Sequence, residues 1–95
     1  MILSAPILKG WSESPRTLAE SLAWSAVETG ETTTGEGFVV REFKWKGATR
    51  EPFLTLERMG WVKMEAVTRL TAGNVTVHFW EAPEGVRGQL KVKTD

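Results

Sequence analysis

The search for chemistry starts from a single histidine, because the 95-residue chain has no cysteine and no other histidine. This residue, His78, lies in the segment NVTVHFWEAP, two positions before Trp80. An unperturbed histidine has a pKa of about 6.5, so it can accept or donate a proton near neutral pH. The residue types therefore allow one enzyme activity, a metal-independent cleavage of RNA with His78 as general acid or base.

The other parts of such a site are also in the chain. Glu65 is the candidate carboxylate partner of His78, and Trp61 or Trp80 can stack on a base. Candidate cations for a pentacoordinate phosphorane are Arg69, Arg87 and Lys91. The strings GWVKM, VTVHFWE and LKVK resemble the tails of small bacterial nuclease toxin domains, which place helices before a meander of strands. The resemblance covers the last third of the chain and includes no catalytic signature, so it implies an RNase only as an alternative.

Metal and cofactor chemistry are not expected. With one histidine and no cysteine, only carboxylates remain as metal ligands, and they form no cluster with the spacing of a ligand loop. The glycine signatures of phosphate-binding and dinucleotide-binding loops are missing, as is the Gly-x-Ser-x-Gly of hydrolases. The sequence therefore predicts neither a metal site nor a cofactor.

Composition is that of one small soluble domain, with 41% hydrophobic and 25% charged residues. No apolar run reaches the ~20 residues that span a membrane. The lack of cysteine fits a reducing compartment, and the predicted location is cytoplasmic. Residues 38–95 carry ten basic and seven acidic residues, a net charge of +3, which is well below the dense basic surface of a dedicated nucleic-acid binder.

One helix is predicted, over about residues 14–29. Ser14 can cap it, Pro15 suits its first position, and Gly30 can end it. On a helical wheel the apolar side collects Leu18, Ala19, Leu22, Ala23 and Ala26. Trp24 falls nearly opposite, so another segment must cover it or a partner must bind it.

The remainder is predicted to form strands, over about residues 38–93, with a further short strand in ILSAPILKG. After the polar loop ETTTGEG come the runs GFVVREFKWKG, PFLTLER, WVKMEAVTRL, NVTVHFWE and VRGQLKVK. Consecutive strands with short turns pair as an antiparallel meander. The predicted fold is thus a single α+β domain over residues 1–95, with one helix on a four- to five-stranded sheet in the order β-α-β-β-β-β.

This order resembles cystatin-like and related two-layer folds, which host inhibitors, small-ligand binders and dimeric accessory proteins. The resemblance is one of architecture. Because the glycine-valine inhibitory loop pattern of cystatins is missing, protease inhibition does not carry over.

Alternation along the strands predicts which side chains face the helix. Tight turns at Ala72-Gly73 and at APEG give a register in which Ala66 faces Phe79 and Val77 faces Leu90. The predicted core face collects Leu54, Leu56, Val62, Met64, Ala66, Leu70, Val75, Val77, Phe79, Leu90 and Val92. His78 then points away from the core, with Val67 and Gln89 as its neighbours.

The opposite face of the sheet, called the outer face below, is predicted to be the functional surface. It carries apolar side chains among charges, namely Phe53, Trp61, Val67 and Trp80 beside Glu65, Arg69, Arg87 and Lys91. An exposed patch of this kind usually marks an interaction surface. A homodimer that packs sheet to sheet, cover by the N-terminal segment or by the loop of residues 28–37, and a functional site are all open explanations.

The sequence thus favours a small binding or interaction protein over an enzyme. It would act through the tryptophan-bearing outer face, as a homodimer or as a surface for a small ligand or protein partner. The predicted binding residues are Trp61, Val67, Trp80, Phe53 and Trp24. Nucleic acid is expected only under the RNase alternative, which uses His78, Glu65, Arg69 and Arg87, and no membrane partner is expected.

Overall fold

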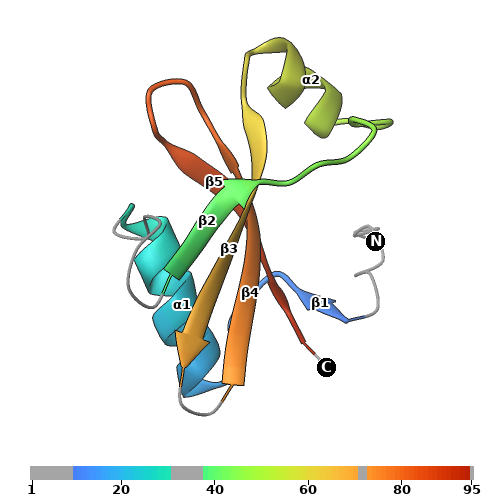
Figure 1. The fold of residues 1–95 in the computed structure, drawn as a ribbon. Helices are drawn as coiled ribbons and strands as arrows, with labels where there is room; N and C mark the ends of the chain where they lie inside the picture. The colour runs from blue at the N-terminus through green and yellow to red at the C-terminus, as the bar shows by residue number, and fades with distance from the viewer. Residues whose placement is uncertain (1–9, 31–37, 71–72, 95) are drawn as a thin grey trace.

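A five-stranded antiparallel sheet forms the centre of the computed structural model, which describes residues 10–30, 38–70 and 73–94. The elements are β1 (Trp11–Ser12), α1 (Leu18–Glu28), β2 (Phe38–Glu42), α2 (Phe53–Arg58), β3 (Val62–Leu70), β4 (Gly73–Glu81) and β5 (Arg87–Lys93). The strand order is β1-β5-β4-β3-β2, so β2 to β5 form a meander (Figure 1). The predicted α+β fold with one antiparallel sheet is confirmed. The strand predicted in ILSAPILKG lies outside the described residues.

Helix α1 begins three residues later than the position that Ser14 predicts. Its N-cap is Thr17, whose side-chain oxygen accepts a hydrogen bond from the backbone N–H of Glu20 at 3.1 Å. The Glu20 carboxylate in turn accepts one from the N–H of Arg16 at 2.8 Å. This exchange resembles a capping box and satisfies two backbone donors at the helix start, which explains why the helix begins here.

The side of α1 that faces the sheet also differs from the prediction. Ala23 and Val27 are buried, and Ala19 and Trp24 pack against the same core. Leu18 and Leu22, which the helical wheel assigned to the core, are 77% and 56% exposed. The row of residues spaced by four, Ala19, Ala23 and Val27, puts mostly small side chains against β4 and β5, so the helix lies close to the sheet. Trp24 is therefore partly buried against the core of its own chain.

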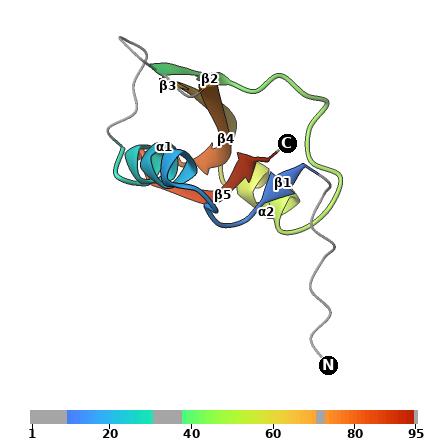
Figure 2. The same cartoon turned by 90° about the horizontal axis from the view of Figure 1, so that it is seen from below.

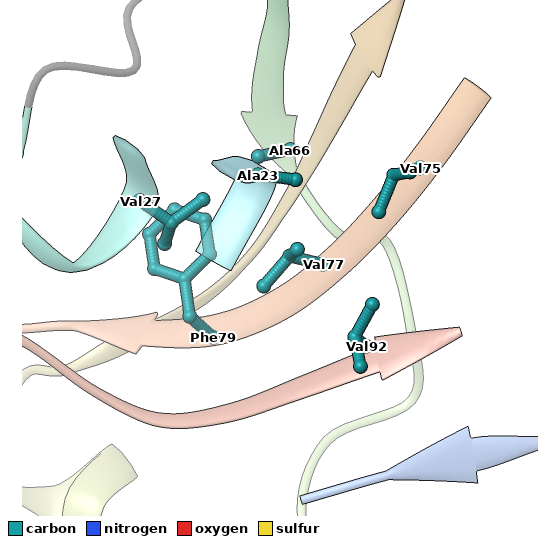
Figure 3. Packing of buried hydrophobic residues seen from close by; sticks show 7 residues of the cluster. All are labelled: Ala23, Val27, Ala66, Val75, Val77, Phe79 and Val92. Atoms are coloured by element: carbon teal, nitrogen blue, oxygen red, sulfur yellow. The ribbon is translucent and has the colours of Figure 1, made fainter. Parts of the chain in front are cut away.

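Figure 3 shows the core between α1 and the sheet. Ala66, Val75, Val77, Phe79 and Val92 point from the strands toward Ala23 and Val27 of the helix. Met64, Leu70 and Leu90 are partly buried beside them, as predicted from the alternation. Val62, at the start of β3, is 39% exposed and does not join the core.

The pairing of β3 with β4 is shifted by two residues from the prediction. Ala66 pairs with Val77 instead of Phe79, and Leu70 pairs with Gly73. A shift of two preserves which face each side chain occupies, because strands alternate with a period of two. His78 accordingly lies on the outer face as predicted, but it pairs with Glu65 on β3 and with Lys91 on β5.

The run PFLTLER forms helix α2 and not a strand. Strand β2 pairs directly with β3, from Phe38 opposite Thr68 to Glu42 opposite Met64. Residues 43–61 are thereby left as a connection, and the short helix is formed within it. Leu54 and Leu56 consequently lie outside the core, contrary to the alternation-based prediction. The connection from β2 to α2, and α2 itself, lie on the side of the sheet away from α1 (Figure 2).

Candidate functional site

The part of the outer face around His78 and Trp80 is covered by residues of the same chain. Trp80 is 3% exposed, although the sequence placed it in an exposed patch. Phe53 of α2 stacks on it, with ring centroids 5.7 Å apart and planes at 11°, and Trp45 meets it edge-on at 5.6 Å. Among the described residues the cover comes mainly from residues 43–53, a segment that the sequence assigned to strands, and Trp11 of β1 packs on His78 beside it. The 28–37 loop, the other predicted source of cover, lies mostly outside the described residues.

A cavity of about 310 Å³ lies between this cover and the sheet. It is called the aromatic–lysine pocket below, and its lining residues are Trp11, Phe43, Trp45, Ala48, Thr49, Arg50, Phe53, Lys63, His78, Phe79, Trp80, Gln89 and Lys91. The volume is at the lower end of the range for small-ligand sites, about 300–1,000 Å³. Among the described lining residues, the formally charged ones are all cationic and none is acidic.

The lysine side chains lie over aromatic rings. The Lys63 Nζ is 4.3 Å from the centroid of the Trp45 ring and 5.2 Å from that of Phe43. The Lys91 Nζ lies 5.6 Å from the Phe53 centroid, and the Arg50 guanidinium carbon 5.9 Å from it. Burial, and then the charge of Lys91, lower the pKa of Lys63. An anion in the pocket would offset the repulsion between these two ammonium groups.

His78 is clamped in the wall of this pocket. Its ring centroid is 4.3 Å from that of Trp11 and 4.5 Å from that of Phe43. Its Nε2 lies 3.0 Å from Oε2 of Glu65, and the two side chains are 12% and 14% exposed. Oε1 of Glu65 also accepts hydrogen bonds from Arg41, 3.0 Å from Nε and 2.8 Å from Nη2. The imidazole is thus fixed by ring contacts and by a carboxylate that is itself held.

The protonation states follow from burial and from this contact. Burial lowers the pKa of His78 and outweighs the opposing effect of Glu65, so the imidazole is neutral at pH 7. Burial alone would raise the pKa of the Glu65 carboxyl, but the hydrogen bonds and charges of His78 and Arg41 hold that pKa below its usual range. Since the carboxylate is ionised, Nε2 of His78 donates to it. The other ring nitrogen, Nδ1, is then an acceptor.

An irregularity in β5 shapes the pocket and has no signal in the sequence. The register shifts between His78 and Trp80, and Gln89 has φ = 54°, the only positive value for a non-glycine residue in the described chain. The left-handed conformation at Gln89 changes the alternation, so the outer-face position predicted for Arg87 is wrong. Arg87 instead donates to Oε2 of Glu81 at 2.8 Å and to the backbone oxygen of Val27 at 3.1 Å.

The structure brings together only part of the predicted site. His78 and Glu65 are in contact, and Phe53 and Trp80 line the pocket with Lys91. Six predicted residues are not among the lining residues, namely Trp24, Trp61, Glu65, Val67, Arg69 and Arg87. Arg69 is four positions from Glu65 on β3, about 13 Å along the strand.

Several pocket residues were not singled out from the sequence. They are Trp11, Phe43, Trp45, Arg50 and Lys63. The alternating string FKWK at residues 43–46 was a usable signal, because it mixes aromatic rings with lysines. Because this string was interpreted as part of a strand, the sequence did not predict that Phe43 would pack on His78 and Trp45 on Trp80.

No protein-family model matches this chain, and neither the curated proteins nor the solved structures include a significant match. Within residues 10–30, 38–70 and 73–94, no three histidine or acidic side chains gather as a metal-binding group. The helices of the same ranges include none that is long and apolar enough to cross a membrane. The function must therefore be inferred from the shape and charge of the pocket.

Proposed function

We propose that this chain is a small binding protein whose aromatic–lysine pocket takes an anionic ligand that carries a planar ring. The observation behind the proposal is a concave space whose described lining residues include six tryptophan and phenylalanine side chains, and whose formally charged members are all cations. Aromatic walls favour a planar ring, since stacking of one base contributes about 1–3 kcal/mol. Lys63, Lys91 and Arg50 favour an anionic group, and their field would attract it from solution.

A nucleotide is the simplest ligand class that combines these two features. It offers a planar base for the rings and a phosphate for the ammonium groups. The cavity of about 310 Å³ suits a ligand no larger than one such unit. Under this proposal the outer face has a specific use within one chain, which is the kind of function that the sequence favours.

The homodimer and the cytoplasmic location that the sequence favours stay predictions. The homodimer was expected because Phe53, Trp61, Val67 and Trp80 were placed together on the outer face. Of these, Trp80 is covered by Phe53 and Trp45. A ligand pocket therefore replaces the homodimer as the favoured explanation of this face. Light scattering would support the homodimer by giving about twice the chain mass of 10.6 kDa.

Calorimetric titration with AMP and with adenosine tests the proposal. AMP is expected to bind, and adenosine more weakly, because it lacks the anion. The Lys63→Gln variant should lose affinity for AMP, whereas Lys44→Gln should not, since Lys44 is exposed and lies outside the lining. Affinity should also fall as salt is added. No binding of AMP or of the other 5′-mononucleotides at millimolar concentration would contradict the proposal.

A further inference from the structure

We infer that the aromatic–lysine pocket cleaves single-stranded RNA without a metal ion, with His78 as the general base. This inference rests on the proposed function, since it assigns a reaction to the same pocket. It keeps Lys91 from the sequence-based RNase alternative and replaces the two arginines with Lys63. Arg69 and Arg87 lie elsewhere, and Lys63 and Lys91 line the pocket together with His78.

His78 is held in the manner of a catalytic base. Catalytic bases are commonly oriented by a carboxylate that accepts from one ring nitrogen, which leaves the other nitrogen as the proton acceptor. Glu65 makes this contact at 3.0 Å, and Arg41 fixes Glu65 in turn. Trp11 and Phe43 on either side restrict rotation of the ring. A histidine with only a packing role needs no such chain of three polar groups.

The positive charges of the pocket are placed near His78. Cleavage of RNA by its own 2′-hydroxyl builds negative charge on the non-bridging oxygens of the phosphate. Fixed cations around that position stabilise the transition state more than the ground state. Lys63 and Lys91 share the pocket with His78, and Lys91 is the direct strand partner of His78. The base and the cations thus face one small space.

The backbone is strained beside the same pocket. Gln89 lines the pocket with φ = 54°, a conformation that a residue with a side chain rarely adopts. Strained backbone of this kind persists where the surrounding structure fixes it, and it is concentrated at functional sites. Here the irregular register between β4 and β5 accompanies the pairing of Lys91 with His78.

The reaction is a transesterification that balances without a co-reactant. The 2′-oxygen of the bound nucleotide forms a bond to the adjacent phosphorus while its proton passes to Nδ1 of His78. The bond between phosphorus and the 5′-oxygen of the next nucleotide breaks, and that oxygen takes a proton from the Lys63 ammonium. The products are a 2′,3′-cyclic phosphate and a free 5′-hydroxyl. Loss of the His78 proton to solvent and uptake of one by Lys63 restore the site.

The experiment compares three strands of one sequence in the presence of EDTA. These are a single-stranded RNA, its DNA counterpart and its 2′-O-methyl counterpart, each labelled at one end. The wild-type chain should bind all three and cut only the RNA, with a 2′,3′-cyclic phosphate as the new end. The His78→Gln variant should cut about 10²–10⁴-fold more slowly. Lys44→Gln, purified in parallel, should cut at the wild-type rate and controls for contaminating nuclease.

Glu65 is a positioning residue in this scheme, and its test is the pH profile. Glu65 raises the pKa of His78 against the larger effect of burial. Glu65→Gln should therefore move the acidic limb of the rate profile to lower pH, as well as reduce the rate. A carboxylate with a purely structural role would leave the position of that limb unchanged.

The outcomes separate the inference from the proposed function. Binding of AMP or of RNA without cleavage would overturn the inference and leave the binding proposal intact. Cleavage by His78→Gln at the wild-type rate, or cleavage of the 2′-O-methyl strand, would also overturn the inference. No binding of any strand and no binding of AMP would overturn both. If His78→Gln does not fold, failure of the folded wild-type chain to cut RNA remains a decisive negative.

Discussion

Glu65 and His78 lie directly opposite each other on β3 and β4, and their side chains meet 3.0 Å apart on the outer face. The next pair along these strands, Ala66 and Val77, points the other way and is fully buried under α1. One register therefore sets both the core and the polar pair. A slip of one residue would put this polar pair against the helix. Because burying polar groups there is costly, the same register that forms the core also fixes the geometry of the pocket.

The first prediction concerns the pH dependence of stability. Burial lowers the pKa of His78 below its ordinary value of about 6.5, so the unfolded chain takes up this proton at a higher pH than the folded chain. The free energy of unfolding should then be highest above about pH 6.5 and fall as the pH drops toward the pKa of folded His78. Glu65, whose pKa is also lowered, should add a further loss at more acidic pH, below about 4.3.

Urea unfolding from pH 7.5 to 3.5 measures this effect. The His78→Gln variant should lose the decline just below pH 6.5 and keep the more acidic one. An identical pH profile for His78→Gln and the wild type would show that His78 is not the group responsible.

The sequence could predict the two faces of the sheet but not the pocket on one of them. Alternation assigned Val77 to the core and His78 to the outer face, and an error of two residues in the turn left that assignment unchanged. Alternation also made PFLTLER look like a strand, because Leu54 and Leu56 are separated by one residue. Whether such a short run forms a strand or a short helix depends on whether a neighbouring strand is available to pair with it. The local sequence pattern does not contain this information.

The irregularity at Gln89 was beyond sequence reasoning for a different reason. A position with left-handed backbone is usually occupied by glycine or asparagine, which makes it predictable from the sequence. Glutamine gives no such signal. Arg87 was therefore assigned to the outer face by an alternation that the left-handed residue interrupts. The contact between Glu65 and His78 was proposed from residue types alone, and the structure supplies the register that brings the two together.

The second prediction compares two tryptophans of the pocket. Trp80 is 3% exposed, so Trp80→Ala should cost about 3–5 kcal/mol of unfolding free energy. Trp45 is 39% exposed, so Trp45→Ala should destabilise the fold much less. Trp45→Ala should nevertheless weaken AMP binding by about 1–3 kcal/mol, because it removes a stacking surface. Chemical unfolding and calorimetry on both variants give the comparison, and equal loss of stability would contradict the arrangement of the cover.

The third prediction tests which side of α1 faces the sheet. Val27 is fully buried, whereas Leu22 is 56% exposed. Val27→Ala should cost about 2 kcal/mol, and Leu22→Ala should stay within about 0.5 kcal/mol. Both substitutions keep a residue that suits a helix, so propensity differences are small. Thermal or urea unfolding decides between this orientation and the helical wheel, which would make Leu22→Ala the more harmful change.

The fourth prediction concerns the left-handed residue in β5. At φ = 54° a residue with a side chain costs about 1–2 kcal/mol relative to an ordinary conformation, and a β-branched residue fits least well. Gln89→Gly removes this cost, but glycine loses more conformational entropy on folding. The Gln89→Gly variant should therefore be about as stable as the wild type or more stable. Gln89→Val should be less stable than Gln89→Gly by about 1–2 kcal/mol.

Gln89→Val should also weaken AMP binding, because relief of the strain would alter the pairing of Lys91 with His78. Urea unfolding and AMP titration of the two variants provide the measurement, with Gln89→Asn as a control that tolerates the left-handed region. Equal stability of the glycine and valine variants would mean that side chains alternate regularly along β5. Arg87 would then lie on the outer face, as the sequence predicted.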